Sequence, residues 1–325
     1  MKPGIWSRLS GIAKPVLFGL LVAAVVILAL EYCRRPNAED QEREEYNSNP
    51  LPEETEPLIA PFYPTINTIE LVETMADKLK YLYAIEDGAY VTDADLDIKG
   101  GISMNMESNL SGPDPKVLIF HTHSMESYKD AVPGSDEGSV VGLGRLLAWI
   151  LAEEYNVMSV HDSGKYDVVD GKEHRDGSYG RMSESVEKII ERYPTIEVAI
   201  DLHRDGVDES IHLVQEVNGL PTARMMLVEG VAMLDDNGKP KPIPDLANPY
   251  VKENLALSLQ VQLAANETYP GLMRMIYIKP YRYSLYMLPK SVLVEVGAQN
   301  NTVQEARNAM WPLAQILMSV LQEKD

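Results

Sequence analysis

Three short apolar runs that lead into or contain polar side chains constrain the fold of this chain more than any other feature. Runs at 117–120 and 198–202 each lead into histidine, and a third run at 292–296 carries an acid within it. Runs of this length are typical of strands buried in a sheet. Because α/β proteins place functional side chains at the carboxyl ends of their strands, the three runs predict one shared site. Its polar residues are His121, His123, Glu126, His203 and Glu295.

Between these runs, strand-like and helix-like patterns alternate along the chain. Strands are expected at 116–120, 157–160, 197–202, 223–229, 273–278 and 291–296. Apolar residues at helical spacing predict helices at 66–82, 139–154, 183–192, 251–267 and 303–322. This alternation predicts an α/β fold, a three-layer sandwich around a mixed, mostly parallel sheet.

The N-terminal part of the chain is organised differently. Residues 16–30 contain no polar side chain, and with the segment back to Gly11 they reach the length of about 20 residues that a membrane-spanning helix needs. A cleaved signal peptide is the alternative, but no small-residue cleavage site follows the run. More basic residues precede the run than follow it, which favours a cytoplasmic N-terminus. We therefore expect one transmembrane helix before the folded body.

Composition divides the chain into four expected parts. The membrane anchor occupies 1–35, and the Glu-, Pro- and Asn-rich stretch 36–64 predicts a solvated linker. Residues 65–112 are expected to form an N-terminal extension packed on the main domain at 113–325. The single cysteine, Cys33, leaves the body without an internal disulfide. A formal charge of -20 argues against nucleic acid as a partner, because nucleic-acid binding requires a basic face.

The polar residues at the strand ends are the ligand types of a catalytic zinc site. His123 and Glu126 lie three residues apart, a spacing typical of zinc carboxypeptidases, so one turn can direct both at one point. Zinc hydrolases use three protein ligands and keep an open position for water. We therefore predict that His123, Glu126 and His203 bind Zn²⁺. His121 and His123 are expected to alternate along the strand and so to point the same way. His121 therefore remains the alternative to His123, and otherwise it would support a ligand or contact the substrate.

Glu295 and Arg204 are the predicted catalytic residues. Glu295 is flanked by apolar residues, and burying it would be costly unless it faces a site or a partner. Desolvation would raise its pKa, which suits a general base acting on water at the open zinc position. The alternative is a carboxylate on a half-exposed edge strand. Arg204, directly after His203, could stabilise an oxyanion or hold a substrate carboxylate, and a solvated arginine is the alternative.

The motif segments together resemble the stage II sporulation protein P family of endospore-forming bacteria. The similar segments are 116–128, 199–206, 292–302 and the loop 177–181, together with the N-terminal anchor and linker. The resemblance implies a zinc-dependent peptidoglycan hydrolase related to N-acetylmuramoyl-L-alanine amidases. It also implies the amidase α/β sandwich, which shares its zinc layout with zinc carboxypeptidases.

The resemblance further implies a setting and a set of partners. The expected reaction is cleavage of the amide between N-acetylmuramic acid and L-alanine, with endopeptidase activity on stem-peptide cross-links also credited to the family. The expected setting is the sporulation septum during engulfment, with the catalytic domain outside the cell membrane and the N-terminal helix in membrane lipid. The expected partners are peptidoglycan, a lytic transglycosylase and a membrane scaffold protein.

Two other functions stay open at this point. One is a zinc carboxypeptidase or endopeptidase that acts only on stem peptides. The other is a metal-free scaffold that binds the wall without catalysis. The stretch 233–250 looks like an inserted loop, and it could alter substrate preference if it borders the groove.

Overall fold

The computed structural model describes residues 62–323 of the chain. The expected membrane anchor at 1–35 and the linker up to residue 61 lie outside the described residues. Within the described part, no helix has the length and apolar character required to cross a membrane.

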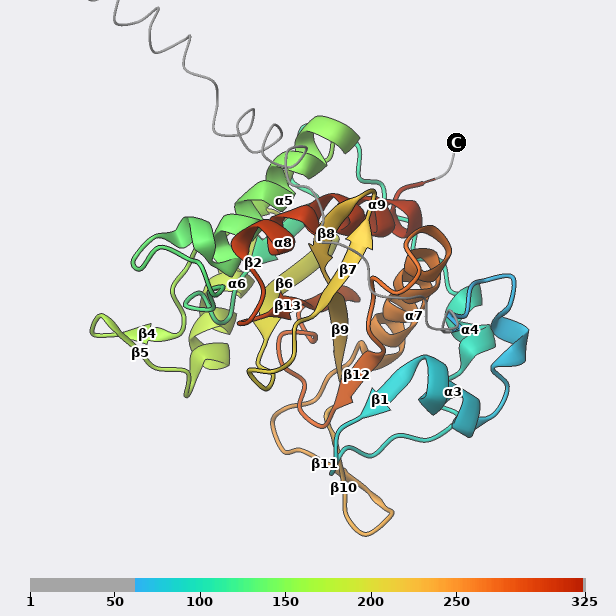
Figure 1. Ribbon diagram of the computed structural model, residues 1–325. Helices are drawn as coiled ribbons and strands as arrows, with labels where there is room; N and C mark the ends of the chain where they lie inside the picture. The colour runs from blue at the N-terminus through green and yellow to red at the C-terminus, as the bar shows by residue number, and fades with distance from the viewer. Residues whose placement is uncertain (1–61, 324–325) are drawn as a thin grey trace, which may run out of the picture. The chain divides into compact units, whose positions relative to one another are not determined.

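A seven-stranded sheet organises the described residues (Figure 1). In order across the sheet, the strands are β1 (Tyr83–Ile85), β12 (Ile276–Lys279), β9 (Met225–Gly230), β13 (Lys290–Ala298), β6 (Val198–Asp205), β2 (Val117–Phe120) and β3 (Ser159–His161). Neighbouring strands are parallel except β9 and β13, which are antiparallel. The prediction of an α/β fold with a mixed, mostly parallel sheet is therefore confirmed.

Strand direction brings several chain segments to one edge of the sheet. β13, β6 and β2 run the same way, so their carboxyl ends meet at that edge. β9 runs against β13 and brings its amino end there. Glu295 on β13 and His203 on β6 are register partners, so their side chains lie on the same face.

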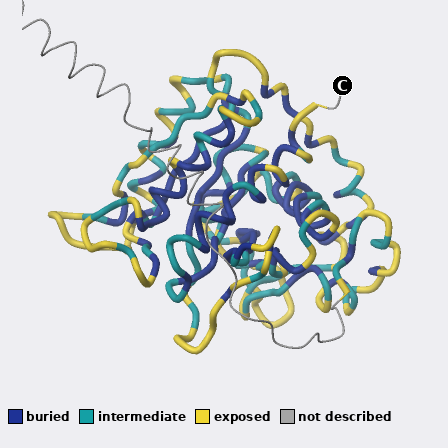
Figure 2. Tube along the Cα trace, turned by 45° about the horizontal axis from the view of Figure 1, so that its top comes forward, coloured by how far each residue is buried: buried dark blue, intermediate teal, exposed yellow. Residues whose placement is uncertain are grey.

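Helices cover both faces of the sheet. α5 (Val140–Tyr155), α7 (Val251–Thr268) and α9 (Met310–Leu321) pack on one face through the main apolar core. α6 (Ser178–Arg192) packs on the other face, where Met182 and Val186 join a second apolar cluster. Figure 2 shows the central strands largely buried and the outer loops exposed.

Shorter elements complete the described residues. The helices are η2 (Ile69–Leu71), α3 (Met75–Tyr81), α4 (Ile98–Ser103), η3 (Asp136–Gly138) and α8 (Val303–Asn308). Three hairpins pair β4 (Val168–Val169) with β5 (Lys172–Glu173), β7 (Val214–Val217) with β8 (Leu220–Ala223), and β10 (Met233–Asp235) with β11 (Pro240–Pro242). β10 and β11 lie within residues 233–250, the stretch that the sequence suggested is an inserted loop. β1 lies in the segment expected as an N-terminal extension, so that segment contributes a strand to the main sheet.

Two predicted helices are shorter than expected. Within the helix predicted at 66–82, the only α-helix is α3, because Thr74 and Asp77 make a capping box that starts it there; the 3-10 helix η2 precedes it. The helix predicted at 303–322 divides into α8 and α9. Pro312 explains this break, because it has no N–H to donate to the carbonyl of Asn308.

Glu229 on β9 is a buried acid on the α7 face of the sheet, away from α6. It is 1% exposed, and Ser258 on α7 donates a hydrogen bond to its Oε1. Burial raises the pKa of Glu229 from 4.5 to about 8. Between these two pH values the unfolded chain loses this proton while the folded chain retains it. The free energy of unfolding therefore falls as pH rises.

Replacing Glu229 with glutamine should flatten this pH dependence, because glutamine does not titrate. Relative to the wild type, Glu229→Gln should gain stability as pH rises from about 5 to about 8. Urea unfolding at several pH values measures the difference. A difference between the two proteins that stays constant with pH would contradict the prediction.

Candidate functional site

The carboxyl ends of β2 and β6 bring three of the predicted residues together. A turn after β2, in which Glu126 N donates to His123 O at 3.2 Å, places His123 and Glu126 beside β6. Nδ1 of His123 lies 3.4 Å from Glu126 Oε1, and Nδ1 of His203 lies 3.1 Å from Glu126 Oε2. One ligand atom from each of the three residues lies within 4.8 Å of the others. The group could therefore hold a metal ion.

The spacing and chemistry of these donors fit zinc. Ligand atoms about 2.0–2.2 Å from a tetrahedral ion lie about 3.3–3.6 Å from one another, close to the separations around Glu126. Burial disfavours the charged form of His203, but the carboxylates of Asp201 and Glu126 outweigh it and raise the pKa of His203 well above its ordinary value. The carboxylates thus favour positive charge at this point, as a cation site requires.

The turn that carries Glu126 is anchored at both ends. Ser124 Oγ and Met125 N donate to the carboxylate of Asp167 at 2.6 and 3.0 Å. Glu126 is 3% exposed, and its Oε2 accepts from the backbone N of Arg204 at 3.0 Å. These hydrogen bonds hold the carboxylate of Glu126 in place without a bound metal ion.

Asp201 lies beneath His203 and is fully buried. Its carboxylate accepts from Thr122 N at 2.9 Å and from Thr122 Oγ1 at 2.6 Å. Asp201 Oδ1 also lies 2.8 Å from His203 Nε2, although that nitrogen makes no hydrogen bond. We therefore regard this last contact as a close approach of opposite charges rather than an aligned hydrogen bond. Thr122 thus fixes the carboxylate of Asp201 next to the imidazole of His203.

Glu295 lies beside His203 with an unpaired oxygen. The residue is partly exposed, but its Oε2 is enclosed by protein and makes no hydrogen bond. Burial raises the pKa of Glu295 to about 8; the charge of His203 opposes this shift, and that of Glu126 adds to it. The edge-strand alternative is wrong, because β13 lies between β9 and β6 in the sheet. An acid with this pKa can accept and release a proton near neutral pH.

His121 does not join this group. β2 ends at Phe120, so His121 and His123 do not alternate along a strand as the sequence suggested. His121 is 0% exposed; its Nδ1 lies 2.9 Å from Leu202 O, and its Nε2 lies 2.9 Å from His161 Nε2. Burial lowers the pKa of His121 to about 3 and that of His161 to about 4, so both imidazoles are neutral. Of the two histidines after β2, only His123 is brought to Glu126.

Arg204 lies next to the group, but its guanidinium bonds to backbone carbonyls. Nε donates to Ser127 O at 3.0 Å and NH1 donates to Asp205 O at 3.1 Å. These bonds tie β6 to the turn that carries Glu126. A role for Arg204 toward substrate stays a prediction.

The loop before α6 and the first turn of α6 add residues to which the sequence assigned no role in the site. Arg175 NH1 lies 3.3 Å from Glu126 Oε1, and the ring of Tyr179 meets that of His123 edge-on with centroids 5.6 Å apart. Arg181 holds this loop by donating to the carbonyls of Tyr166, His174 and Asp176. The loop thus forms one wall of the site. No strand or helix pattern in the sequence indicated that it folds back onto Glu126.

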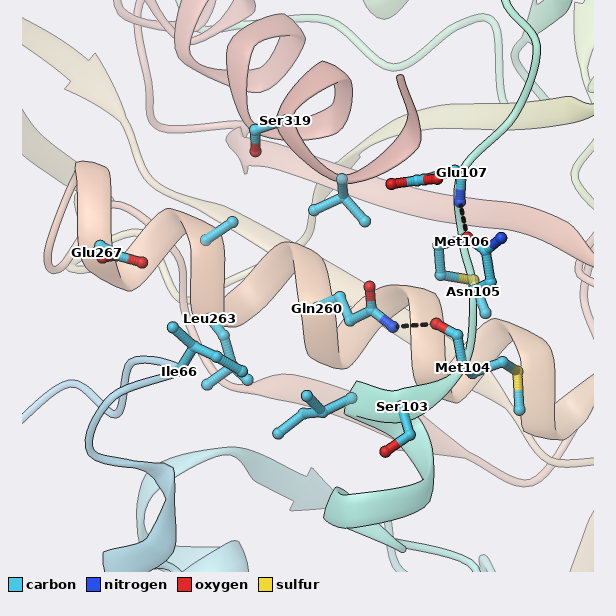
Figure 3. Close-up of a pocket in the computed structure, with 13 residues that line it drawn as sticks. Ile66, Ser103, Met104, Asn105, Met106, Glu107, Gln260, Leu263, Glu267 and Ser319 are labelled. Atoms are coloured by element: carbon cyan, nitrogen blue, oxygen red, sulfur yellow. Dashed lines mark hydrogen bonds between the residues drawn. The ribbon is translucent and has the colours of Figure 1, made fainter. Parts of the chain in front are cut away.

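A separate groove lies between α4, α7 and the end of α9 (Figure 3). Its lining contains no histidine and no basic residue, and it lies on the α7 side of the sheet, whereas His203 and Glu295 face the α6 side. It is therefore not part of the candidate metal site. The lining residues are Ile66, Ile102, Ser103, Met104, Asn105, Met106, Glu107, Gln260, Leu263, Ala264, Glu267, Ser319 and Val320.

Comparison with known proteins gives one strong match. Residues 34–318 match the family model of Stage II sporulation protein P (SpoIIP). No curated protein sequence matches the chain.

Similarity to solved structures is weak. N-acetylmuramoyl-L-alanine amidase AmiC2 of Nostoc punctiforme is 15% identical, with a TM-score of 0.37 over 64% of this chain and 98% of that chain. The N-acetylmuramyl-L-alanine amidase Ami1 of Mycobacterium smegmatis is 16% identical, with a TM-score of 0.34 over 65% of this chain and 100% of that chain.

Proposed function

The chain belongs to the Stage II sporulation protein P family, and from this premise we propose that it is a peptidoglycan hydrolase of sporulation. Specifically, we propose a zinc-dependent amidase that cleaves the bond between N-acetylmuramic acid and L-alanine. The observation that carries the proposal is the grouping of His123, Glu126 and His203 beside Glu295, whose Oε2 has no hydrogen bond. A zinc hydrolase needs three metal ligands and a general base, and these four residues can fill those roles.

The proposed roles follow from the positions of the side chains. Zn²⁺ held by His123, Glu126 and His203 would supply a Lewis acid and lower the pKa of a water toward about 7. Glu295 accepts one proton from the water that attacks the amide carbon. The C–N bond then breaks, and Glu295 returns this proton to the leaving amine of L-alanine. The products are a carboxylate on the muramic acid and a free stem peptide.

When water attacks the amide, negative charge develops on its carbonyl oxygen, and a nearby positive group would stabilise that charge. The guanidinium of Arg204 is already bonded to two carbonyls. Arg175 is exposed; its Nε donates to the exposed Glu173 at 3.0 Å, and its NH1 lies 3.3 Å from Glu126 Oε1. We therefore propose that Arg175 stabilises the oxyanion and that Arg204 positions the turn carrying Glu126.

The cellular setting is also a proposal. The apolar stretch at 11–30 supports a single membrane anchor with the N-terminus in the cytoplasm and the catalytic domain outside. Family membership supports a septal role in engulfment, with peptidoglycan as substrate and a lytic transglycosylase and a membrane scaffold protein as partners.

Digestion of sacculi by the purified full chain tests the proposed reaction. Zinc content is measured first, and released products are identified by mass spectrometry with chelator-treated protein as the control. We expect one zinc per chain and free stem peptides whose release stops with chelator and returns with zinc. Shortened peptides still attached to muramic acid would instead identify a peptidase. Absence of both zinc and products would overturn the proposal in favour of a wall-binding scaffold.

A further inference from the structure

A cavity of about 370 Å³ lies beside Glu295, along the sheet from the candidate metal site. Met226, in its wall, is the register partner of Glu295 across β9 and β13. Asp205, also in its wall, is two residues beyond His203 on β6. The strands β9, β12 and β1 that contribute to the cavity lie next to one another (Figure 1). The cavity is therefore continuous with the face that carries His203 and Glu295.

Two arginines and one acid determine the charge of this cavity. Arg274 NH1 donates to Asp205 Oδ2 at 2.6 Å, which pairs one arginine with the acid. Arg224 donates its Nε–H to Gly271 O at 2.8 Å, and among residues 62–323 it forms no ion pair with a carboxylate. Burial lowers the pKa of the Arg224 guanidinium; Tyr63 opposes this shift and the charge of Arg274 adds to it. The wall thus carries one positive charge in excess.

The neighbouring charges do not cancel this excess. Tyr277, in the wall, has its hydroxyl 3.4 Å from Glu86 Oε1, but Lys279 Nζ lies 3.2 Å from the same carboxylate. Glu86 and Lys279 therefore neutralise each other. Arg224 is half-buried and has no carboxylate partner among residues 62–323, so its guanidinium is available to an anionic ligand.

We propose that this cavity, which we call the arginine subsite, binds a carboxylate of the stem peptide while the amide lies at Glu295. The inference rests on the proposed function and names a specificity determinant for it. Guanidinium groups suit carboxylates because they donate paired hydrogen bonds with the right geometry.

The distances restrict which carboxylate can reach the arginine subsite. Adjacent strands lie about 4.8 Å apart, so β9 and β12 place the subsite roughly 5–10 Å from Glu295. An extended peptide spans about 3.3–3.6 Å per residue. The carboxylate bound there should therefore belong to the second or third residue after the scissile amide. In a stem peptide, the second residue is an acidic one.

Binding measured without turnover tests the subsite separately from the reaction. The full chain carrying Glu295→Gln is titrated calorimetrically with N-acetylmuramoyl-L-alanyl-D-glutamate and with its diamide. We expect the acid to bind at least about 10-fold more tightly, because hydrogen bonds to charged groups are strong. Adding Arg224→Gln should remove most of this preference, and Arg224→Lys should restore part of it. Lys241→Gln, which removes a positive charge from the β10–β11 hairpin, is the matched control and should retain it.

Two outcomes would overturn the arginine subsite. One is equal binding of acid and diamide; the other is an acid preference that survives Arg224→Gln in a protein with an unchanged melting temperature. Hydrolysis by the wild-type chain is measured in parallel. Hydrolysis of both ligands with equal KM would reject the subsite and leave the proposed function intact. Acid-selective binding that depends on Arg224, without any hydrolysis, would support the subsite and reject the proposed function.

Discussion

Replacing Glu295 with glutamine should slow hydrolysis of peptidoglycan by about 10²–10⁴-fold, the usual contribution of a general acid–base group. Glutamine keeps the size of the side chain but cannot accept a proton from water. Because Glu295 is not among the three grouped donors, Glu295→Gln should retain its metal. Initial rates of stem-peptide release and zinc content measured on the same samples test both expectations.

Glu229→Gln is the matched control for this substitution. Both glutamates lie on strands of the central sheet, and burial raises the pKa of each to about 8. Glu229 faces α7, however, and is hydrogen-bonded to Ser258. Its replacement should leave the rate near that of the wild type. Near-wild-type activity in Glu295→Gln would show that another group accepts the proton.

The local parts of the site could be predicted because each one follows a short pattern in the sequence. The apolar runs before His123 and His203, and the run around Glu295, have the length and composition of buried strands. Neighbouring parallel strands then bring their ends together, which is what β13, β6 and β2 do. Periodicity does not reveal where a strand ends. For this reason His121 was expected to face the same way as His123, whereas the chain turns after Phe120 and buries it.

Residues brought in by long-range pairing could not be predicted. Arg224 and Arg274 are isolated arginines 50 positions apart in the sequence. They line one cavity because the segment at Met273 runs parallel to the start of β9 at Met225. Arg175 lies in an exposed loop with no periodic pattern, and it is held near Glu126 by the carbonyl contacts of Arg181 on α6. Chain topology, rather than local composition, determines these positions.

Replacing His123 with alanine should abolish stoichiometric zinc binding and hydrolysis, whereas replacing His121 should leave zinc bound. His123 contributes one of the three grouped donors, and its side chain is 17% exposed, so its loss leaves the core intact. His121 instead bonds to Leu202 O and to His161 beneath α5. Its loss should lower the free energy of unfolding by about 1–3 kcal/mol, because a buried carbonyl loses its partner.

Two measurements separate these effects. One is the zinc content after dialysis, and the other is thermal unfolding measured with and without added zinc. A ligand that binds only the folded state raises its stability. Added zinc should therefore raise the melting temperature of the wild type and of His121→Ala, but not that of His123→Ala. Circular dichroism verifies that His123→Ala is folded. One zinc per chain in His123→Ala would show that His123 is not a ligand, and loss of zinc from a folded His121→Ala as well would identify His121 in its place. The metal would then have to draw the turn after β2 into a different conformation.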